Sequence, residues 1–419
     1  MLIHKLKVAG LLSFGPQGID LPMEPLNVLI GPNGSGKSNF LEAIALLQAL
    51  PRDVFAPLQP RGGLQGSLWN GPEPQKSITM EATLHYPYPQ GNRLRHSFTL
   101  EEKNGRPEFA NEQVLPVGTY GDSRGGLQSL AEDSRTAWSY YRPPLDKNIE
   151  QRLRMSSPNP TDPNSAGSQL VHILNDSIHF RSDWVPQVSL VAIANPTDYP
   201  ALWHLHLSYQ TIQLYRNWSF GPSAELRIPA SAHDRSDFLN EKGTNLATVL
   251  SNFAGPNKRR IVNALQKLYD DIVDIICPVV GGTGHVALFL EEAGNRTIPA
   301  TRLSDGTLHY LCLLAILLHP EPAPVVVIEE PELGLHPDLL PIVADLLVSA
   351  SQRSQLIVTT HSDTLVDALT DTPESVIVCE KHDGQTEMRR LDKGDLAKWL
   401  KDYTLGNLWS SGQIGGNRW

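Results

Sequence analysis

Eight consecutive residues near the start of the chain have the types and the spacing that hold a phosphate group. They are Gly31, Pro32, Asn33, Gly34, Ser35, Gly36, Lys37 and Ser38, and they match G-x-x-x-x-G-K-[ST] at every fixed position. Glycines let backbone N–H groups curl inward, Lys37 can reach the β- and γ-phosphates, and the Ser38 hydroxyl can coordinate Mg²⁺. An apolar run at 26–30 and a helical pattern at 39–47 give this loop a strand–loop–helix context. The sequence therefore predicts nucleotide binding.

Two acidic residues follow a second apolar run. Residues 325–328 predict a strand buried on both faces, and Glu329 and Glu330 stand at its carboxyl end. In this arrangement, called Walker B, one acid holds Mg²⁺ and the next polarises the attacking water. Two solvent-facing acids at a strand end are common by themselves, but that explanation weakens in a chain with a phosphate-binding loop.

Two further signals stand beside predicted elements of the second half. Ser304 and Gly306 lie in a turn that opens the apolar helix from Leu308, where N–H groups and the helix dipole favour a phosphate. For this piece alone, a simple Ser or Asp N-cap is the favoured explanation. His361 follows the apolar run 356–360, where a neutral imidazole can contact a γ-phosphate, although a lone histidine is more often structural. All four signals in this order are less probable by chance than any one.

Alternating helical and strand patterns predict the α/β fold that positions these residues. From 303 to 381 the sequence predicts helices at 307–318, 338–352 and 362–370 and strands at 325–329, 355–360 and 375–380, as in a parallel sheet. The nucleotide-binding core is therefore predicted to be split, comprising 1–50 and 300–419. An inserted mixed α+β lobe, 51–299, is predicted between them. Its first part is rich in strands, with antiparallel ones at 77–84 and 94–100, and residues 245–277 are helical.

Composition limits the class of protein. The net charge of −10 argues against a protein that coats nucleic acid with its whole surface, although charge can be segregated into a local basic groove. The three cysteines lie in apolar runs, which favours buried thiols in a reducing compartment. No run of 18 apolar residues and no signal-peptide pattern occur, so we expect a cytoplasmic protein with no membrane partner.

Five segments carry a resemblance to a known group. They are GPNGSGKSNFLEAI, GTNLATVL, LSDGTLHYLCLLAILL, VVVIEEPELGLHP and IVTTHSDTLVDAL. In wording and order they resemble ABC-type ATPases of the SMC/RecF/OLD group, and in particular stand-alone bacterial AAA-family ATPases with an OLD-like core. The resemblance implies an ABC/RecF-like P-loop ATPase head, with a mixed, largely parallel sheet and flanking helices, that uses ATP and Mg²⁺.

The resemblance also implies roles for individual residues. Nucleotide contacts fall to Asn33, Gly34, Ser35, Gly36, Lys37, Ser38 and Asn39. Ser38 and Glu329 take the Mg²⁺ positions, Glu330 the general-base position and His361 the position of the switch histidine. Ser304 and Gly306 form the signature, which in this group addresses the ATP held by a second subunit. The resemblance therefore implies a head-to-tail homodimer, or a higher homo-oligomer, with composite ATP sites.

Several features bear on the biological role. The usual Walker B aspartate is Glu329, one methylene longer, and Gln59, Gln65 and Gln75 all lie in loop that matches too weakly to supply a Q-loop glutamine. The stretch after His361 is shorter than the roughly 100 residues of an added Toprim nuclease domain. The resemblance therefore implies an ATPase that senses or clamps nucleic acid and controls a separate, nuclease-like effector in anti-phage defence. Alternatives are a slowly hydrolysing, nucleotide-bound scaffold and a RecF-like DNA repair ATPase.

The apolar C-terminal stretch 405–419 allows two interpretations. Its apolar residues, which include Leu405, Leu408, Trp409, Ile414 and Trp419, can pack on the rest of the chain, and this is the favoured interpretation. The stretch can instead be a docking segment for a partner subunit.

Overall fold

A six-stranded sheet at the centre of the molecule carries the predicted nucleotide site. The computed structural model describes residues 2–87, 92–117, 140–142, 173–174, 177–179, 187–197, 199–282 and 284–416. The strand order of this central sheet is β10 (Gln213–Tyr215), β17 (Val325–Glu329), β18 (Gln355–Thr359), β3 (Leu26–Ile30), β19 (Val376–His382) and β20 (Gln385–Arg390). The first five strands are parallel, and β20 returns antiparallel to β19. Their carboxyl ends therefore meet at one edge, which brings the predicted motifs together.

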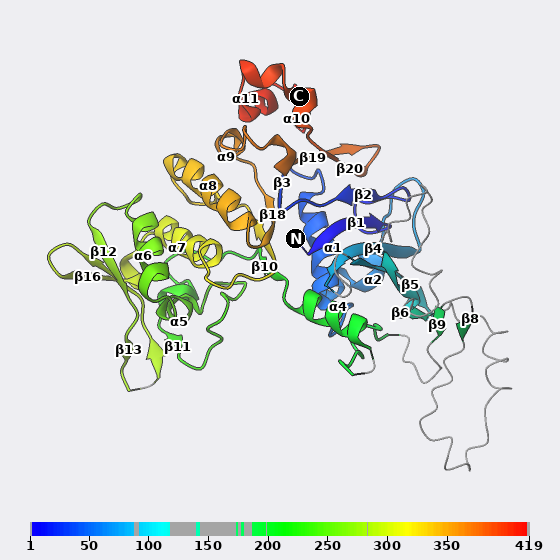
Figure 1. Cartoon of the computed structure of the whole chain (residues 1–419), viewed down its shortest axis with the longest axis horizontal. Helices are drawn as coiled ribbons and strands as arrows, with labels where there is room; N and C mark the ends of the chain where they lie inside the picture. The colour runs from blue at the N-terminus through cyan, green and yellow to red at the C-terminus, as the bar shows by residue number, and fades with distance from the viewer. Residues whose placement is uncertain are drawn as a thin grey trace, which may run out of the picture.

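A second, antiparallel sheet covers the helix that follows the phosphate loop. Its order is β2 (Ile19–Pro22), β1 (Ile3–Ala9), β4 (Ser77–Tyr86), β5 (Asn92–Lys103), β6 (Arg106–Val117), β7 (Tyr140–Arg142), β9 (Ser177–His179) and β8 (Ile173–Leu174); only β7 and β9 pair parallel. Its inner face shares one apolar core with α1 (Lys37–Ala49), α4 (Pro200–Gln210) and one face of the central sheet. Helix α1 thus lies between two sheets (Figure 1). The strands predicted at 77–84 and 94–100 are confirmed within β4 and β5.

The opposite face of the central sheet is covered by helices from the second half of the chain. They are α7 (Asp305–Leu317), α8 (Leu340–Ser351), which continues from the 3-10 turn η5 (Pro337–Leu339), and α9 (Asp363–Asp367). The predicted alternation of helix and strand from 303 to 381 is confirmed, with α9 shorter than expected. Among the described residues, no helix is both long and apolar enough to cross a membrane.

A smaller lobe packs against α7. It contains α5 (Leu246–Ser251), α6 (Gly255–Leu265) and two three-stranded sheets, and it lies at the left of Figure 1. One sheet is β11 (Ala230–Ser231), β14 (His285–Val286) and β13 (Val279–Val280); the other is β12 (Ile272–Ile276), β15 (Phe289–Glu292) and β16 (Arg296–Pro299).

The helix predicted up to residue 277 is wrong beyond Leu265. Residues 272–276 form β12, which pairs antiparallel with β15. Its apolar residues are β-branched isoleucine and valine, which fit a pleated surface better than a helix. The apolar spacing alone did not distinguish the two, and pairing with β15 decides for the strand.

The C-terminal segment packs onto the core. Leu405, Leu408, Trp409 and Ile414 are buried, in and just after α11 (Leu405–Ser410). The Gly406 N–H donates to Asp367 of α9 at 2.7 Å, and the Trp409 indole N–H donates to the Gly416 carbonyl at 2.9 Å. The packing interpretation is therefore confirmed for these four residues, while Trp419 lies outside the described residues.

Both large sheets contain residues from each side of the predicted boundaries at 50 and 300. Strand β4 pairs with β1, and β10 pairs with β17. The division into 1–50 with 300–419 and an inserted lobe, 51–299, stays a prediction.

Candidate functional site

The phosphate loop connects β3 to α1 and is shaped by the strands beside it. Gly31 has φ 148° and Gly36 has φ 102°, and each lacks room for a Cβ atom. A Cβ on Gly31 would collide with the Cys379 carbonyl, and one on Gly36 with the Thr386 side chain. Asn33, Gly34 and Ser38 are exposed at the loop surface, whereas Ser35 and Gly36 are buried. The loop therefore presents an open rim over a tightly packed base.

Lys37 folds back over its own loop. Its ammonium donates to the carbonyls of Gly31 at 2.7 Å and Pro32 at 3.1 Å. Burial lowers the pKa of Lys37, while nearby carboxylates, among them Glu330, oppose that shift. The side chain is thus held at the mouth of the loop, where a phosphate would meet its charge.

The two predicted Mg²⁺ residues lie together. The Ser38 hydroxyl donates to Glu329 Oε1 at 2.6 Å. A hydroxyl and a carboxylate are hard oxygen donors of the kind that Mg²⁺ prefers beside phosphate oxygens. This donor set fits the metal.

Glu330 and His361 also lie together, at the ends of β17 and β18. Glu330 has φ 48°, a left-handed conformation, and its N–H donates to the Thr359 carbonyl at 3.0 Å. This turn leaves Glu330 Oε1 at 3.5 Å from His361 Nε2. An acid and an imidazole therefore share the edge of the sheet where the γ-phosphate is expected.

A third acid, Glu332, was missed by the sequence analysis. Its Oε1 accepts the His361 N–H at 2.6 Å and the Thr360 hydroxyl at 2.8 Å. Its Oε2 is buried with no hydrogen-bond partner among the described residues, and burial raises the pKa of the carboxyl. Glu332 thus joins the turn after β17 to the turn after β18. The extra acid in Glu329-Glu330-Pro331-Glu332 was the available signal.

Asn39 and Ser35 contact residues that no local pattern indicated. Asn39 Nδ2 donates to Ser13 Oγ at 2.6 Å, and the Thr386 hydroxyl donates to the Ser35 carbonyl at 2.9 Å. Ser35 Oγ is buried and has no partner among the described residues. Ser13 lies 26 positions from Asn39 and Thr386 lies 351 positions from Ser35, so only the folded sheets reveal these contacts.

Ser304 and Gly306 lie at the start of α7, apart from the phosphate loop. Ser304 Oγ accepts the Thr307 N–H at 3.1 Å, which is the predicted N-cap. Gly306 packs against the Gly334 carbonyl, and Asp305 accepts the Gly221 N–H at 3.0 Å and pairs with Arg227. Within the described chain, no hydrogen bond joins Ser304 or Gly306 to residues 31–39.

Aromatic residues join the start of α7 to the turn that follows the Walker B strand. The Trp218 indole N–H donates to the Glu329 carbonyl at 2.9 Å, and His309 Nδ1, on α7, donates to the Leu333 carbonyl at 2.5 Å. The His309 ring lies 4.6 Å from Trp218 and 4.9 Å from Phe220, and burial lowers the pKa of His309 to about 4. Since His309 is neutral and donates through Nδ1, its buried Nε2 carries a lone pair. This contact ties α7 to the turn after Walker B.

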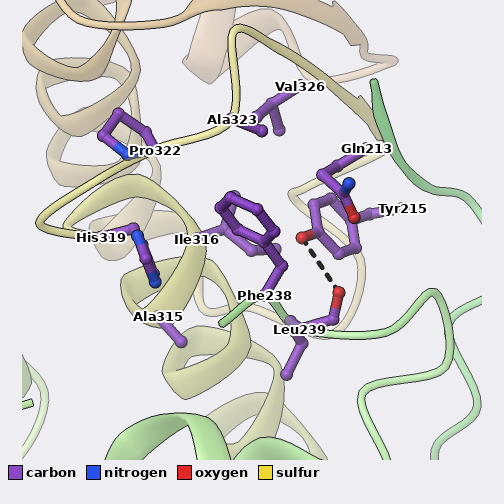
Figure 2. A pocket seen from close by; sticks show the side chains of 10 residues that line it. All are labelled: Gln213, Tyr215, Phe238, Leu239, Ala315, Ile316, His319, Pro322, Ala323 and Val326. Atoms are coloured by element: carbon purple, nitrogen blue, oxygen red, sulfur yellow. Dashed lines mark hydrogen bonds between the residues drawn. The ribbon is translucent and has the colours of Figure 1, made fainter. Parts of the chain in front are cut away.

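A cavity beside β10 is too small for a nucleotide. It has a volume of about 10 Å³, room for about one water molecule, and Tyr215, Phe238 and His319 are among its lining residues (Figure 2). The Tyr215 hydroxyl donates to the Leu239 carbonyl at 3.2 Å at its edge.

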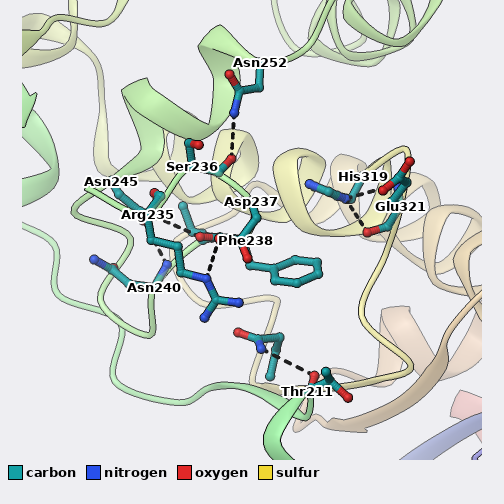
Figure 3. A network of polar contacts seen from close by, with 12 residues as sticks. Thr211, Arg235, Ser236, Asp237, Phe238, Asn240, Asn245, Asn252, His319 and Glu321 are labelled. Carbon is teal, nitrogen blue, oxygen red and sulfur yellow. Dashed lines mark hydrogen bonds and ion pairs between the residues drawn. The ribbon is translucent and has the colours of Figure 1, made fainter. Parts of the chain in front are cut away.

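The GTNLATVL motif has a structural role in this fold. Asn245 Nδ2 donates to the carbonyls of Arg235 at 2.7 Å and Phe238 at 2.9 Å, and its Oδ1 accepts the Asn240 N–H at 2.8 Å (Figure 3). One buried amide side chain therefore holds the loop 235–240 in place.

Comparisons with known proteins agree with this geometry. The model of the family described as "AAA domain, putative AbiEii toxin, Type IV TA system" matches residues 26–367. The protein named OLD nuclease from Thermus scotoductus is 29% identical over 161 residues, and the match covers 33% of this chain and 28% of that protein. The chain thus spans 28% of the length of this relative.

Solved structures show the same fold. An Smc head bound to the C-winged helix domain of ScpA aligns with a TM-score of 0.55 at 16% identity, over 94% of this chain and 99% of that one. A second Smc head, with an extended coiled coil, is bound to the C-terminal domain of ScpA and comes from Pyrococcus furiosus. It aligns with a TM-score of 0.53 at 14% identity, over 96% of this chain and 98% of that one. The fold is that of an SMC head, a mixed α/β ATPase fold with parallel and antiparallel sheets.

Proposed function

The chain belongs to the AAA-domain family whose model matches residues 26–367, and from that premise we propose that this AAA/SMC/OLD-type ATPase hydrolyses ATP as a head-to-tail dimer. One observation carries the proposal. The phosphate loop, Glu329, Glu330 and His361 converge at one sheet edge, whereas Ser304 and Gly306 stand apart at the start of α7. A second copy of the chain would bring its α7 to the first copy's phosphate loop.

The proposed reaction assigns one task to each residue. Lys37 and the N–H groups of the loop bind and orient the phosphates, and Ser38 and Glu329 would hold Mg²⁺, which would neutralise charge on the phosphates. Glu330 accepts a proton from water as the water oxygen attacks the γ-phosphorus, and the bond to ADP breaks. His361, held by Glu332 and beside Glu330, contacts the γ-phosphate.

We propose that this cycle senses or clamps nucleic acid in the cytoplasm and controls a separate, nuclease-like effector in anti-phage defence. The name of the Thermus scotoductus relative, OLD nuclease, supports a link to nucleic acid. The Smc heads solved with domains of ScpA support partner binding by this fold. Two exposed arginines on β5, Arg93 and Arg95, have no carboxylate within ion-pair distance among the described residues, and they offer a first contact for phosphates.

The test traps the dimer. Glu330→Gln removes the proton acceptor but leaves binding intact, so ATP and Mg²⁺ should shift this variant from monomer to dimer in light scattering. Lys37→Ala should stay monomeric under the same conditions. A Glu330→Gln variant that stays monomeric at saturating ATP contradicts the dimer, and unchanged phosphate release in both variants contradicts the assigned chemistry.

A specific contact favours a second candidate function, a nucleotide-bound scaffold that hydrolyses slowly. Glu329 already accepts the Ser38 hydroxyl at 2.6 Å, and its longer side chain can hold the metal in a geometry unsuited to turnover. One retained ATP per chain with little phosphate release, together with intact assembly, would favour the scaffold.

A further inference from the structure

The base of the phosphate loop is held by two hydroxyl side chains from distant parts of the chain. Ser13 follows β1, and Thr386 lies on β20, so both stand outside the range 26–367 that the family model matches. Thr386 Oγ1 lies 2.6 Å from Ser13 Oγ, and the Thr386 N–H donates to the Ser13 carbonyl at 2.8 Å. Both residues are buried, with Thr386 2% exposed, so water cannot readily replace either hydroxyl.

These contacts form a hydrogen-bond chain with one direction. The Thr386 hydroxyl donates its single proton to the Ser35 carbonyl, so it accepts a hydrogen bond from the Ser13 hydroxyl. Ser13 Oγ in turn accepts a hydrogen bond from Asn39 Nδ2. The chain therefore runs from Asn39 on α1 through Ser13 and Thr386 to Ser35. Because each hydroxyl both donates and accepts, the links strengthen one another.

The last bond of this hydrogen-bond chain sets the direction of one amide of the phosphate loop. A trans peptide places its C=O and N–H on opposite sides. Fixing the Ser35 carbonyl toward Thr386 therefore aims the Gly36 N–H, one of the loop amides expected to bind phosphate, away from Thr386. Gly36 has no room for a Cβ at this position, because the Thr386 side chain fills it.

We propose that Ser13 and Thr386 are positioning residues for nucleotide binding, which pre-set the phosphate loop by orienting the Ser35–Gly36 peptide and the start of α1. The inference rests on the proposed ATP site. The hairpin of β19 and β20, beyond the family range, is then part of the nucleotide site, although neither hydroxyl touches the phosphates.

The experiment compares side chains at position 386 in the full chain. The affinity for a fluorescent ATP analogue is titrated for the wild type, Thr386→Val, Thr386→Ser and the control Thr370→Val. This control loses a hydroxyl that donates to the Asp367 carbonyl in α9 and accepts the Leu405 N–H, away from the phosphate loop. Thr386→Val should weaken binding about tenfold, because a buried carbonyl loses its donor. Thr386→Ser should stay within about twofold, and Thr370→Val should bind as the wild type does. The inference is overturned if Thr386→Val binds the analogue with the affinity of the wild type. It is also overturned if Thr386→Val and Thr386→Ser lose the same affinity.

Ser13→Ala tests the proposal where Thr386→Val folds poorly, because it removes the neighbouring hydroxyl of the same hydrogen-bond chain and should also weaken binding of the analogue. Where both single variants fold, Ser13→Ala/Thr386→Val should bind only slightly more weakly than the single variant with the lower affinity. If the double variant instead shows the sum of the two single losses in binding free energy, to within about twofold in affinity, the two hydroxyls act separately and the proposal is overturned. Lys37→Ala distinguishes failure of this inference from failure of the proposed ATP site. If Lys37→Ala binds the analogue with normal affinity, the assignment of the ATP site itself is wrong.

Discussion

The phosphate loop is tied to distant segments by buried hydrogen bonds, whereas the start of α7 is held by its own N-cap and by the loop around Gly221. In the first region Ser38 donates to the distant Glu329, and the Ser35 carbonyl accepts from the distant Thr386 hydroxyl. Lys37 donates to carbonyls of its own loop. In the second, Ser304 bonds within its own helix, and no described hydrogen bond reaches residues 31–39.

This difference indicates which half of the proposed composite site is already formed within one chain. A surface assembled from distant segments has a fixed geometry before any ligand arrives, so it can bind nucleotide alone. In the proposed dimer, the capped start of α7 would instead contact the nucleotide held by the second copy. The two regions should therefore respond differently to substitution, and the tests below run from the largest expected effect to the smallest.

Lys37→Ala should separate the regions most clearly. Loss of a charged donor costs about 3 kcal/mol, so ATP affinity should fall about 100-fold. The control Lys381→Ala removes an exposed lysine of β19 and should bind ATP normally. Calorimetric titration measures both, and equal affinities would show that the first region does not hold the phosphates.

The link between the regions should make stability depend on pH. Burial lowers the pKa of His309 to about 4, below the value of about 6.5 in an unfolded chain. Its contribution is fully present above pH 6.5 and is lost as the pH falls toward 4, because only the unfolded chain then binds the proton. The expected loss is about 3 kcal/mol in the free energy of unfolding.

Urea denaturation at pH 7, 6, 5 and 4 measures this loss. His309→Asn keeps an N–H donor for the Leu333 carbonyl but does not titrate, so its curve should be flatter than that of the wild type. Parallel curves for the two proteins would contradict the assignment of a neutral, buried His309.

Gly306→Ala should affect only the second region. The added Cβ would meet the Gly334 carbonyl at 2.5 Å and shift the start of α7. ATP-dependent dimerisation should weaken about tenfold, a cost of about 1.4 kcal/mol. Binding of ATP by the single chain, which serves as the internal control, should stay unchanged. If ATP binding falls equally, the regions are not independent.

Glu329→Asp should have the smallest effect. The shorter acid withdraws from Ser38 and restores the residue usual in this group of ATPases, so turnover should rise about threefold, less than 1 kcal/mol in barrier. Steady-state phosphate release measures it. A fall in turnover would mean that the glutamate is the better length for this metal site.

Sequence patterns predicted those parts of the site that depend only on a few neighbouring residues. The phosphate loop, the strand ending in Glu329 and Glu330, and the strand before His361 each depend on a few adjacent residues, and all three are in place. The α/β fold class followed from their alternation with helices.

The remaining parts depend on pairing between distant strands. Thr386 meets the loop because β19 pairs with β3, and Trp218 meets Glu329 because β10 pairs with β17. No spacing rule connects such positions. The error at 272–276 has the same origin, since β15 decides the conformation of a segment whose apolar spacing suits a helix too.

The position of β3 between β18 and β19 has a consequence for synthesis on the ribosome. The strand that leads into the phosphate loop is made early, yet both of its neighbours are made after residue 354. Until they emerge, the fully buried residues of β3 have no sheet to join. Strand pairings this far apart form slowly and leave apolar segments exposed to aggregation. The nascent chain therefore cannot form the nucleotide pocket gradually, and we expect it to need protection by chaperones until β18 and β19 are translated.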